Sequence, residues 1–214
     1  MRNLQKTGGI AALSEAIIYL SAFIFFGAFW HYPTGADVAQ KLAFLSDKQV
    51  TLSIVNFIIY VLFGILLAIL VLALHERIKD KALSLSQLAS VFGIIWVGLV
   101  IASGMVKNIG LETVINLSIQ DPEQAMTVWI AISAITEGLG GGNEIVGGFW
   151  VLLISIAALK ANELPKMLNF LGLLVGTAGI LTVFSADILT EVFGISQIVW
   201  FIWLGFVMLK KPSN

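Results

Sequence analysis

The sequence has no cysteine, few charged residues and no basic tract. The absence of cysteine excludes disulfides, thiolate metal sites, iron–sulfur clusters and a cysteine nucleophile. Charged residues make up 12% of the 214 residues, against about 25% in ordinary soluble domains. With a formal net charge of −1 and no run of Lys or Arg, nucleic acid is not an expected partner. The chain therefore lacks the polar composition of a soluble protein.

Apolar residues are in excess, at 58% of the chain with a mean hydropathy of +0.97. They fall into six stretches, each close to the roughly 20 residues that a bilayer crossing requires. These stretches are Gly8–Trp30, Thr51–Leu74, Gln87–Val106, Gly141–Ala158, Met167–Ser185 and Leu189–Leu209. We predict an all-α polytopic membrane protein with a single six-helix transmembrane domain over residues 1–214.

Basic residues are divided unevenly between the two sides of the predicted bundle. Six crossings put both termini on one side, and that side holds nine of the twelve Lys and Arg residues. Because cytoplasmic loops retain Lys and Arg, we predict that both termini are cytoplasmic. Nine acids lie outside or near the outer boundary, where they would attract cations or amines. Exposed loops are also commonly acidic without any ligand.

The outer loops contain short helical patterns. Apolar residues recur at helical spacing in the loop 31–50 and predict an amphipathic helix at the membrane surface. They are Val38, Leu42 and Leu45. A similar apolar face follows Lys107 and consists of Leu111, Val114, Ile115 and Ile119. We therefore expect short interfacial helices on the outer side.

A further helix start lies at Asp121, which can cap a helix whose first residue is Pro122. Unbroken to Leu159, that helix would hold 38 residues and measure about 57 Å, against a hydrocarbon core of about 30 Å. Three consecutive glycines, 140–142, favour a break instead. The first part, 122–139, then either lies at the outer interface, which we favour, or dips into the membrane and returns.

Two acids are the leading candidates for function. Glu15 lies about two turns inside the first predicted helix, where an acid is a functional candidate by default. A carboxyl group in low dielectric tends to hold a proton, so Glu15 is either a proton carrier or a packing residue. Glu144 precedes small residues at three- and four-residue steps, which favour a face packed against another helix. It either faces a ligand there or only caps its own helix.

Three more polar residues complete the candidate ligand-binding set. Asn143 begins the helix after the glycines, where free amide donors can bind a polar group. Asn56 lies about two turns into the second helix, at a predicted depth similar to that of Glu144. Asp187 lies near the outer boundary. Hydrogen bonding between helices is the commoner role for such groups.

Several chemistries lack the residues they require. His31 and His75 are predicted at opposite ends of the bundle, so they cannot jointly bind one haem or zinc ion. Lys107 is expected at a helix end, which leaves no intramembrane lysine for a Schiff base. Ser103 has no histidine at a matching depth. We predict no cofactor, no metal ion and no catalytic residue.

Three groups of residues carry a resemblance to a known family. They are the basic start Arg2 to Lys6 leading into Gly9-Ile10-Ala11, the polar Asn56, and Glu144-x-x-Gly147-Gly148-Phe149-Trp150. With these features the chain resembles, over nearly its whole length, a bacterial family of small six-helix integral membrane proteins of unknown function. The resemblance implies a bacterial inner-membrane location and no established activity.

Three classes of function follow from these observations. The leading hypothesis is a protein that binds or helps to move a small cationic or amphipathic ligand in an outward-facing polar pocket. The second is a membrane-embedded enzyme acting on a lipid, with Glu144 or Glu15 as general acid or base. The third is an accessory subunit, in which the acids and Gly172-x-x-x-Gly176 serve packing alone. The expected partners are membrane lipids, a small molecule, and a second copy or another membrane subunit.

Overall fold

Apolar runs of this length fold as helices because a helix satisfies its backbone polar groups within the segment. The computed structural model describes residues 2–141, 143–184 and 186–210, and within these ranges it contains helices and no strands. Four helical segments are long and apolar enough to cross a membrane: Asn3–Phe29, Gln49–Ser118, Pro122–Ala161 and Ile188–Leu209. The all-α fold class is confirmed, and the long apolar helices suggest a membrane location.

The elements follow one another along the chain with short connections. In order they are α1 (Arg2–Ile24), η1 (Phe25–Phe29), α2 (Val38–Asp47), α3 (Gln49–Asn56), η2 (Phe57–Leu62), α4 (Phe63–Ser118), α5 (Pro122–Thr136), η3 (Glu137–Gly141), α6 (Ile145–Ala161), α7 (Lys166–Leu181) and α8 (Asp187–Leu209). The three η elements are π-helical segments, in which the backbone is wider than in an α-helix.

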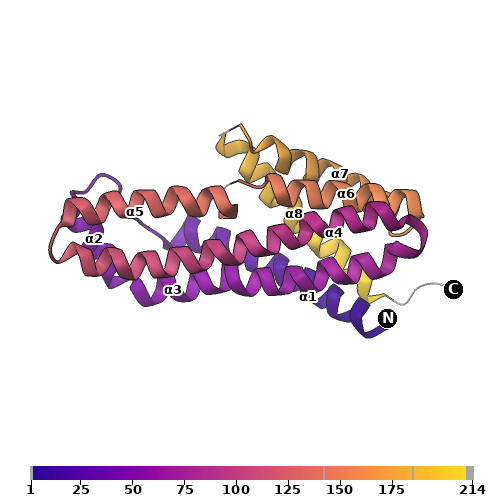
Figure 1. Ribbon diagram of the computed structural model, residues 1–214, viewed down its shortest axis with the longest axis horizontal. Helices are drawn as coiled ribbons and strands as arrows, with labels where there is room; N and C mark the ends of the chain where they lie inside the picture. The colour runs from indigo at the N-terminus through magenta and orange to yellow at the C-terminus, as the bar shows by residue number, and fades with distance from the viewer. Residues whose placement is uncertain (1, 142, 185, 211–214) are drawn as a thin grey trace.

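The long element α4 is a helical hairpin and not one straight helix. Its backbone is non-helical at Ala82, with φ −147° and ψ 56°, and there the chain reverses (Figure 1). The two limbs then pack antiparallel, with Gly64 against Ile101 and Gly93 against Val71. The predicted second and third apolar stretches therefore form separate limbs. The predicted fifth stretch forms α7, which at 16 residues and about 24 Å is shorter than the hydrocarbon core.

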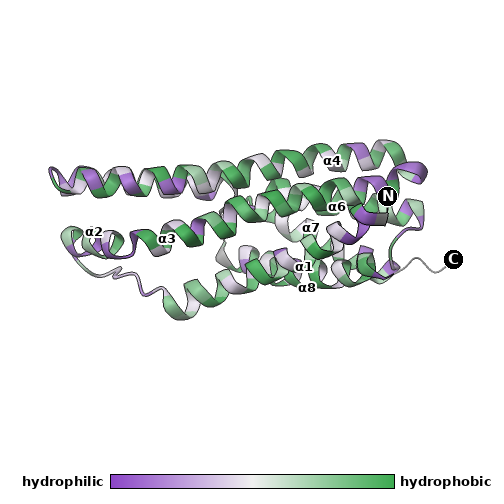
Figure 2. Cartoon of the chain, turned by 90° about the horizontal axis from the view of Figure 1, so that it is seen from below, coloured by the Kyte–Doolittle hydropathy of each residue, from purple (hydrophilic) through white to green (hydrophobic). Residues whose placement is uncertain are grey.

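The start of α1 and the end of α8 lie at one end of the elongated molecule, beside the turn of α4 (Figure 1). The α6–α7 connection lies at this end as well. Basic residues concentrate here, on the α4 turn and around the α6–α7 connection. The opposite end carries α2, α5 and the beginning of α3 (Figures 1 and 2). The long axis of the molecule thus separates a basic end from the end formed by the expected outer loops.

Buried apolar residues form two separate clusters. The larger lies in what we call the main bundle, formed by α1, residues 63–106 of α4, α6, α7 and α8. The smaller lies in what we call the outer module, formed by α2, α3, residues 107–118 of α4, and α5. Its buried members are Leu42, Leu45, Leu52, Leu111, Val114 and Ala125. The outer end of the molecule therefore has a small core of its own.

The outer module contains both of the helices that we expect at the membrane interface. The helix α2 forms as predicted, with a capping box between Asp37 and Gln40. Its apolar residues Leu42 and Leu45 are buried against other segments of the protein. The second expected interfacial helix is the continuation of α4, in which Leu111 and Val114 are buried. Packing among these four segments buries part of their apolar faces, while Ile109 and Ile119 stay exposed.

The helix α5 begins as predicted, because Asp121 Oδ1 accepts a hydrogen bond of 3.0 Å from the Gln124 amide. It runs beside α4, where Ser103 Oγ donates to the Thr136 carbonyl over 2.9 Å. Lys107 Nζ likewise lies 2.9 Å from Ser133 Oγ. The segment 122–139 thus packs on α4 along its length, and its position relative to a membrane stays a prediction (Figure 1).

Candidate ligand-binding pocket

The predicted helix break positions Glu144 inside the molecule. The π-helical segment η3 ends the α5 helix, and Gly140 adopts φ +143°, a conformation that suits glycine because it has no Cβ. The chain then turns through Asn143, whose amide donates to the Glu137 carbonyl over 3.1 Å. The Glu144 amide donates to Thr182 Oγ1 on the neighbouring helix over 2.9 Å. This bond ties the start of α6 to the end of α7.

The side chain of Glu144 is buried and does not cap its own helix. Glu144 occupies the N-cap position of α6, but its carboxylate makes no capping hydrogen bond. Only 6% of the residue is exposed, and Oε2 is buried without a hydrogen-bond partner. The expectation that Glu144 might only cap its helix is therefore wrong. A buried carboxylate without a partner is unusual and points to a role beyond packing.

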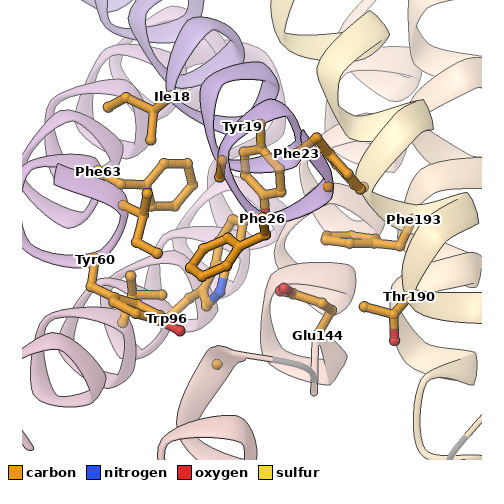
Figure 3. Close-up of a pocket in the computed structure, with 16 residues that line it drawn as sticks. Ile18, Tyr19, Phe23, Phe26, Tyr60, Phe63, Trp96, Glu144, Thr190 and Phe193 are labelled. Atoms are coloured by element: carbon orange, nitrogen blue, oxygen red, sulfur yellow. The ribbon is translucent and has the colours of Figure 1, made fainter. Parts of the chain in front are cut away.

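Glu144 faces a pocket of about 350 Å³ inside the main bundle. Its carboxylate points toward the interior of that pocket (Figure 3). The walls come from α1, η1, η2, both limbs of α4, η3 and α8. Among the 16 residues that line it, Glu144 is the only charged one. The pocket therefore combines a single negative group with apolar walls.

Aromatic side chains form a connected wall opposite Glu144. The Tyr19 ring meets the Phe63 ring edge-on, with centroids 5.4 Å apart. Phe63 meets Trp96 in the same way at 5.8 Å. Phe26 and Tyr60 complete the wall (Figure 3). Ring faces carry negative potential and attract cations, so this wall and Glu144 favour the same sign of ligand charge.

All three π-helical segments contribute to the lining. Phe26 and Gly27 come from η1, Ile59 and Tyr60 from η2, and Gly140 from η3. These segments are far apart in the sequence but meet around one cavity. Single-turn π segments within helices occur frequently at functional sites. Their convergence is a backbone feature that marks this pocket independently of its side chains.

Small residues behind the pocket hold the wall in place, as the predicted stripe on α6 suggested. A Cβ on Gly147 would lie 2.7 Å from the Trp96 ring, so that ring packs directly on the α6 backbone. A Cβ on Gly148 would lie 2.7 Å from the Gly176 carbonyl oxygen. The stripe therefore faces α4 on one side and α7 on the other. Close backbone approach is what fixes Trp96 and Glu144 relative to each other.

The remaining predicted site residues separate into different roles. Asn56 does not line the pocket; its amide donates to Asn108 Oδ1 over 3.0 Å and links α3 to α4. Asn143 does not line the pocket either. Its Oδ1 accepts a hydrogen bond of 3.2 Å from the backbone amide of Ile145. The polar side chains of both residues thus bond to other groups of the chain, and their role in ligand binding stays a prediction. The side chain of Asp187 lies outside the described part of the structure. Glu15 is fully buried in the main bundle, one helical turn from Tyr19.

Sequence reasoning missed the aromatic residues of the pocket, chiefly Tyr19, Tyr60 and Trp96. Tyr19 carried one available signal, because it lies four residues after Glu15 and therefore on the same helix face. Nothing in their local sequence distinguishes Tyr60 or Trp96 from other aromatic residues of apolar helices. Only the packing of η2 against the second limb of α4 brings them together.

The described residues form neither a serine-histidine catalytic site nor a metal site. Ser103 is buried and donates to the Thr136 carbonyl, with no histidine beside it. His75 pairs with Ser86 at 2.8 Å near the turn of α4, and His31 is exposed beyond η1. Within the described ranges, no group of three His, Asp or Glu side chains is placed to hold a metal ion.

The fold and pocket together define an all-helical protein with helices of membrane-spanning length and a buried acid in an aromatic pocket. Comparison of the chain with protein-family models, curated proteins and solved structures finds no match in any of the three. These comparisons neither support nor contradict the resemblance to the bacterial six-helix family.

Proposed function

We propose that this protein binds, and helps to move, a small organic cation with an apolar body in an outward-facing pocket of a bacterial inner membrane. Glu144 is the counter-charge, and Tyr19, Tyr60 and Trp96 surround the cation. We further propose six crossings with both termini in the cytoplasm, which places the pocket and outer module toward the outside. An amine or quaternary ammonium compound is the matching ligand class.

One observation carries the proposal: the buried Glu144 carboxylate has an unpartnered oxygen and points into an apolar pocket with no other charge among its described lining residues. A buried carboxylate is costly unless a positive group pairs with it. An anion would face that carboxylate without compensation, and a neutral ligand would leave it unpaired. A cavity of about 350 Å³ is at the small end of ligand pockets, which favours a small molecule.

The alternative of a lipid-modifying enzyme has weaker support. General acid–base catalysis needs a second functional group within about 3 Å of the transferred proton or in contact with the substrate. Glu144 Oε2 has no hydrogen-bond partner, and the pocket contributes no histidine, lysine or arginine. An accessory role for the acids would likewise leave the unpartnered carboxylate unexplained.

Binding of benzyltrimethylammonium tests the proposal directly. Purified protein in lipid nanodiscs is titrated with this quaternary ammonium ion, and the heat of binding is measured. Glu144→Gln keeps the shape of the side chain and removes the charge that pairs with the ligand. We expect its Kd to rise at least tenfold, about 1.4 kcal/mol, because loss of a buried charge pair usually costs more than that.

The matched control is Glu112→Gln, which removes the same charge from an exposed position of α4 away from the pocket. Its Kd should stay within about twofold of the wild-type value, because exposed charges are screened by solvent and salt. Equal binding by wild type and a folded Glu144→Gln variant would remove Glu144 from the site. Absence of binding by the wild-type protein would contradict this ligand class.

A further inference from the structure

Glu15 forms a second buried acidic position, deeper in the main bundle than the pocket. The residue is fully buried, and neither of its carboxyl oxygens has a hydrogen-bond partner. None of the buried side chains that α4 and α8 contribute to the described core is charged. No basic residue in the described chain pairs with it. A carboxyl group in such surroundings must be neutralised by one positive charge, either a proton or a cation.

Tyr19 connects this position to the pocket. It lies one turn from Glu15 on α1 and reaches into the pocket from that helix (Figure 3). Tyr19 is close enough to both Glu15 and Glu144 for either carboxylate to act on it electrostatically. Tyr60, from η2, also lies within the electrostatic range of Tyr19 and Glu144. Among the described residues, the titratable groups linked to Glu15 in this way are Tyr19 of its own helix and, beyond it, Tyr60 and Glu144.

Gln197 supplies an uncharged polar group on the helix packed against α1. It is fully buried in α8, and both its amide nitrogen and its amide oxygen lack a hydrogen-bond partner. Its neighbour one turn along, Phe201, meets the Tyr19 ring at 6.2 Å. Buried amides with both ends unsatisfied are rare in folded proteins. An amide can donate to a carboxylate with its nitrogen or face a cation with its oxygen.

We infer that Glu15 is a second cation position on a path through the main bundle, and that the protein exchanges its organic cation for a proton there. The inference rests on the proposed function, because the cation reaches Glu15 from the pocket past Tyr19. The exchange balances: the cation passes from the Glu144 carboxylate to the Glu15 carboxylate as the Glu15 proton passes to Glu144, so the O–H bond broken at Glu15 is replaced by one at Glu144. Each carboxyl group then carries one neutralising charge before and after the step.

The test measures exchange separately from binding. Liposomes containing the protein are prepared with an interior at pH 6 and transferred to pH 8 with external benzyltrimethylammonium. This ion has no titratable proton, so any coupled proton movement belongs to the protein. We expect the probe to accumulate inside while a trapped pH dye reports loss of internal protons. Reversing the pH gradient should reverse the direction of net transport.

Glu15→Gln should lower the rate of pH-driven uptake at least tenfold while changing the Kd for benzyltrimethylammonium less than threefold. Glu15→Asp keeps the carboxyl group and should retain measurable exchange. Glu112→Gln is the control for both readouts and should match the wild type. Retained binding shows that the Glu15→Gln protein is folded. If that variant does not fold, the wild type and Glu15→Asp decide the question through their dependence on the pH gradient.

Three results would overturn the inference and leave the proposed function standing. The first is a wild-type protein that binds the probe but takes none up under either gradient. The second is uptake that ignores the pH gradient. The third is a Glu15→Gln protein that exchanges at the wild-type rate, or a Glu15→Asp protein that fails as completely as Glu15→Gln. No binding by the wild type at all would instead refute the proposed function itself.

Discussion

Three glutamates of this chain have different roles because their surroundings differ. Glu163 pairs with Lys81 at 2.8 Å and Arg77 at 3.3 Å near the turns of the molecule. Glu144 faces the pocket, whereas Glu15 is enclosed in the main bundle. Neither forms an ion pair in the described structure. The residue type alone says little about function. The presence or absence of a partner, which packing decides, separates structural acids from candidate binding sites.

At the scale of one residue, Gly148 gives a direct test of the packing behind the pocket. A Cβ at this position would lie 2.7 Å from both the Gly176 oxygen and the Ile180 nitrogen, which are backbone atoms. Gly148→Ala should therefore destabilise the protein by about 1–3 kcal/mol, as overpacked sites do. Thermal unfolding of the detergent-solubilised protein, followed by tryptophan fluorescence, measures the change.

Gly98→Ala is the matched control for that prediction. Gly98 lies on an exposed face of α4, and a Cβ there would meet nothing within 4 Å. Alanine favours a helix over glycine by roughly 0.5–1 kcal/mol, so this variant should be as stable as the wild type or slightly more stable. Equal stability of the two alanine variants would show that α6 and α7 do not pack as closely as described.

At the scale of elements, the connection between α6 and α7 is held by side chains from the turn of α4. Asn162 ends α6 in the left-handed conformation, with φ 52°, which asparagine tolerates better than most residues. Asn169 of α7 then donates to the Glu163 carbonyl over 3.1 Å. Together with the ion pairs of Glu163, these bonds fix α6 and α7 against the hairpin of α4.

The ion pairs of Glu163 make the stability of this junction depend on pH. Partial burial alone would raise the pKa of Glu163, but the hydrogen bonds and charges of Lys81 and Arg77 outweigh it and lower that pKa. A lowered pKa in the folded state adds stability above the unfolded value of about 4.3. That contribution is lost as the pH falls through the folded value. Glu163→Gln should therefore cost up to about 1 kcal/mol at pH 7 and nothing at strongly acidic pH.

Unfolding midpoints of wild type and Glu163→Gln, measured between pH 3 and pH 8, check this expectation. The two curves should converge at the acid end and separate as the pH rises. Glu112→Gln, an exposed acid without an ion pair in the described structure, should follow the wild type throughout. A constant difference between wild type and Glu163→Gln across the range would mean that the charge of Glu163 is not what stabilises the junction.

At the scale of the whole molecule, the basic and outer ends predict which segments face the cytoplasm. The chain has no cysteine, so single introduced cysteines report accessibility without background. Ser84, beside the turn of α4, and Gln120, before α5, are both exposed. In right-side-out membrane vesicles, a membrane-impermeant maleimide should label Gln120→Cys and spare Ser84→Cys. Inverted vesicles should give the opposite result, and labelling of both positions from one side would contradict the proposed topology.

The sequence determined those features that depend on local physics. Long apolar runs require helices in a membrane, Asp121 and Pro122 start α5, and the glycines after Glu137 end it. The stripe of small residues on α6 likewise identified a closely packed face. Each of these follows from residues adjacent in the chain or within a few turns. The class of protein and the position of the helix break were therefore predictable.

Only the tertiary structure decided which polar groups face the pocket. Asn56 and Glu144 are polar residues at similar predicted depths. In the structure Asn56 donates a hydrogen bond to Asn108, whereas one oxygen of Glu144 has no partner. The outer module forms because apolar faces of helices that are distant in the sequence pack against one another. The hydrophobic effect depends on how much apolar area is buried and not on which helix buries it. The apolar pattern of a helix therefore does not determine its neighbours.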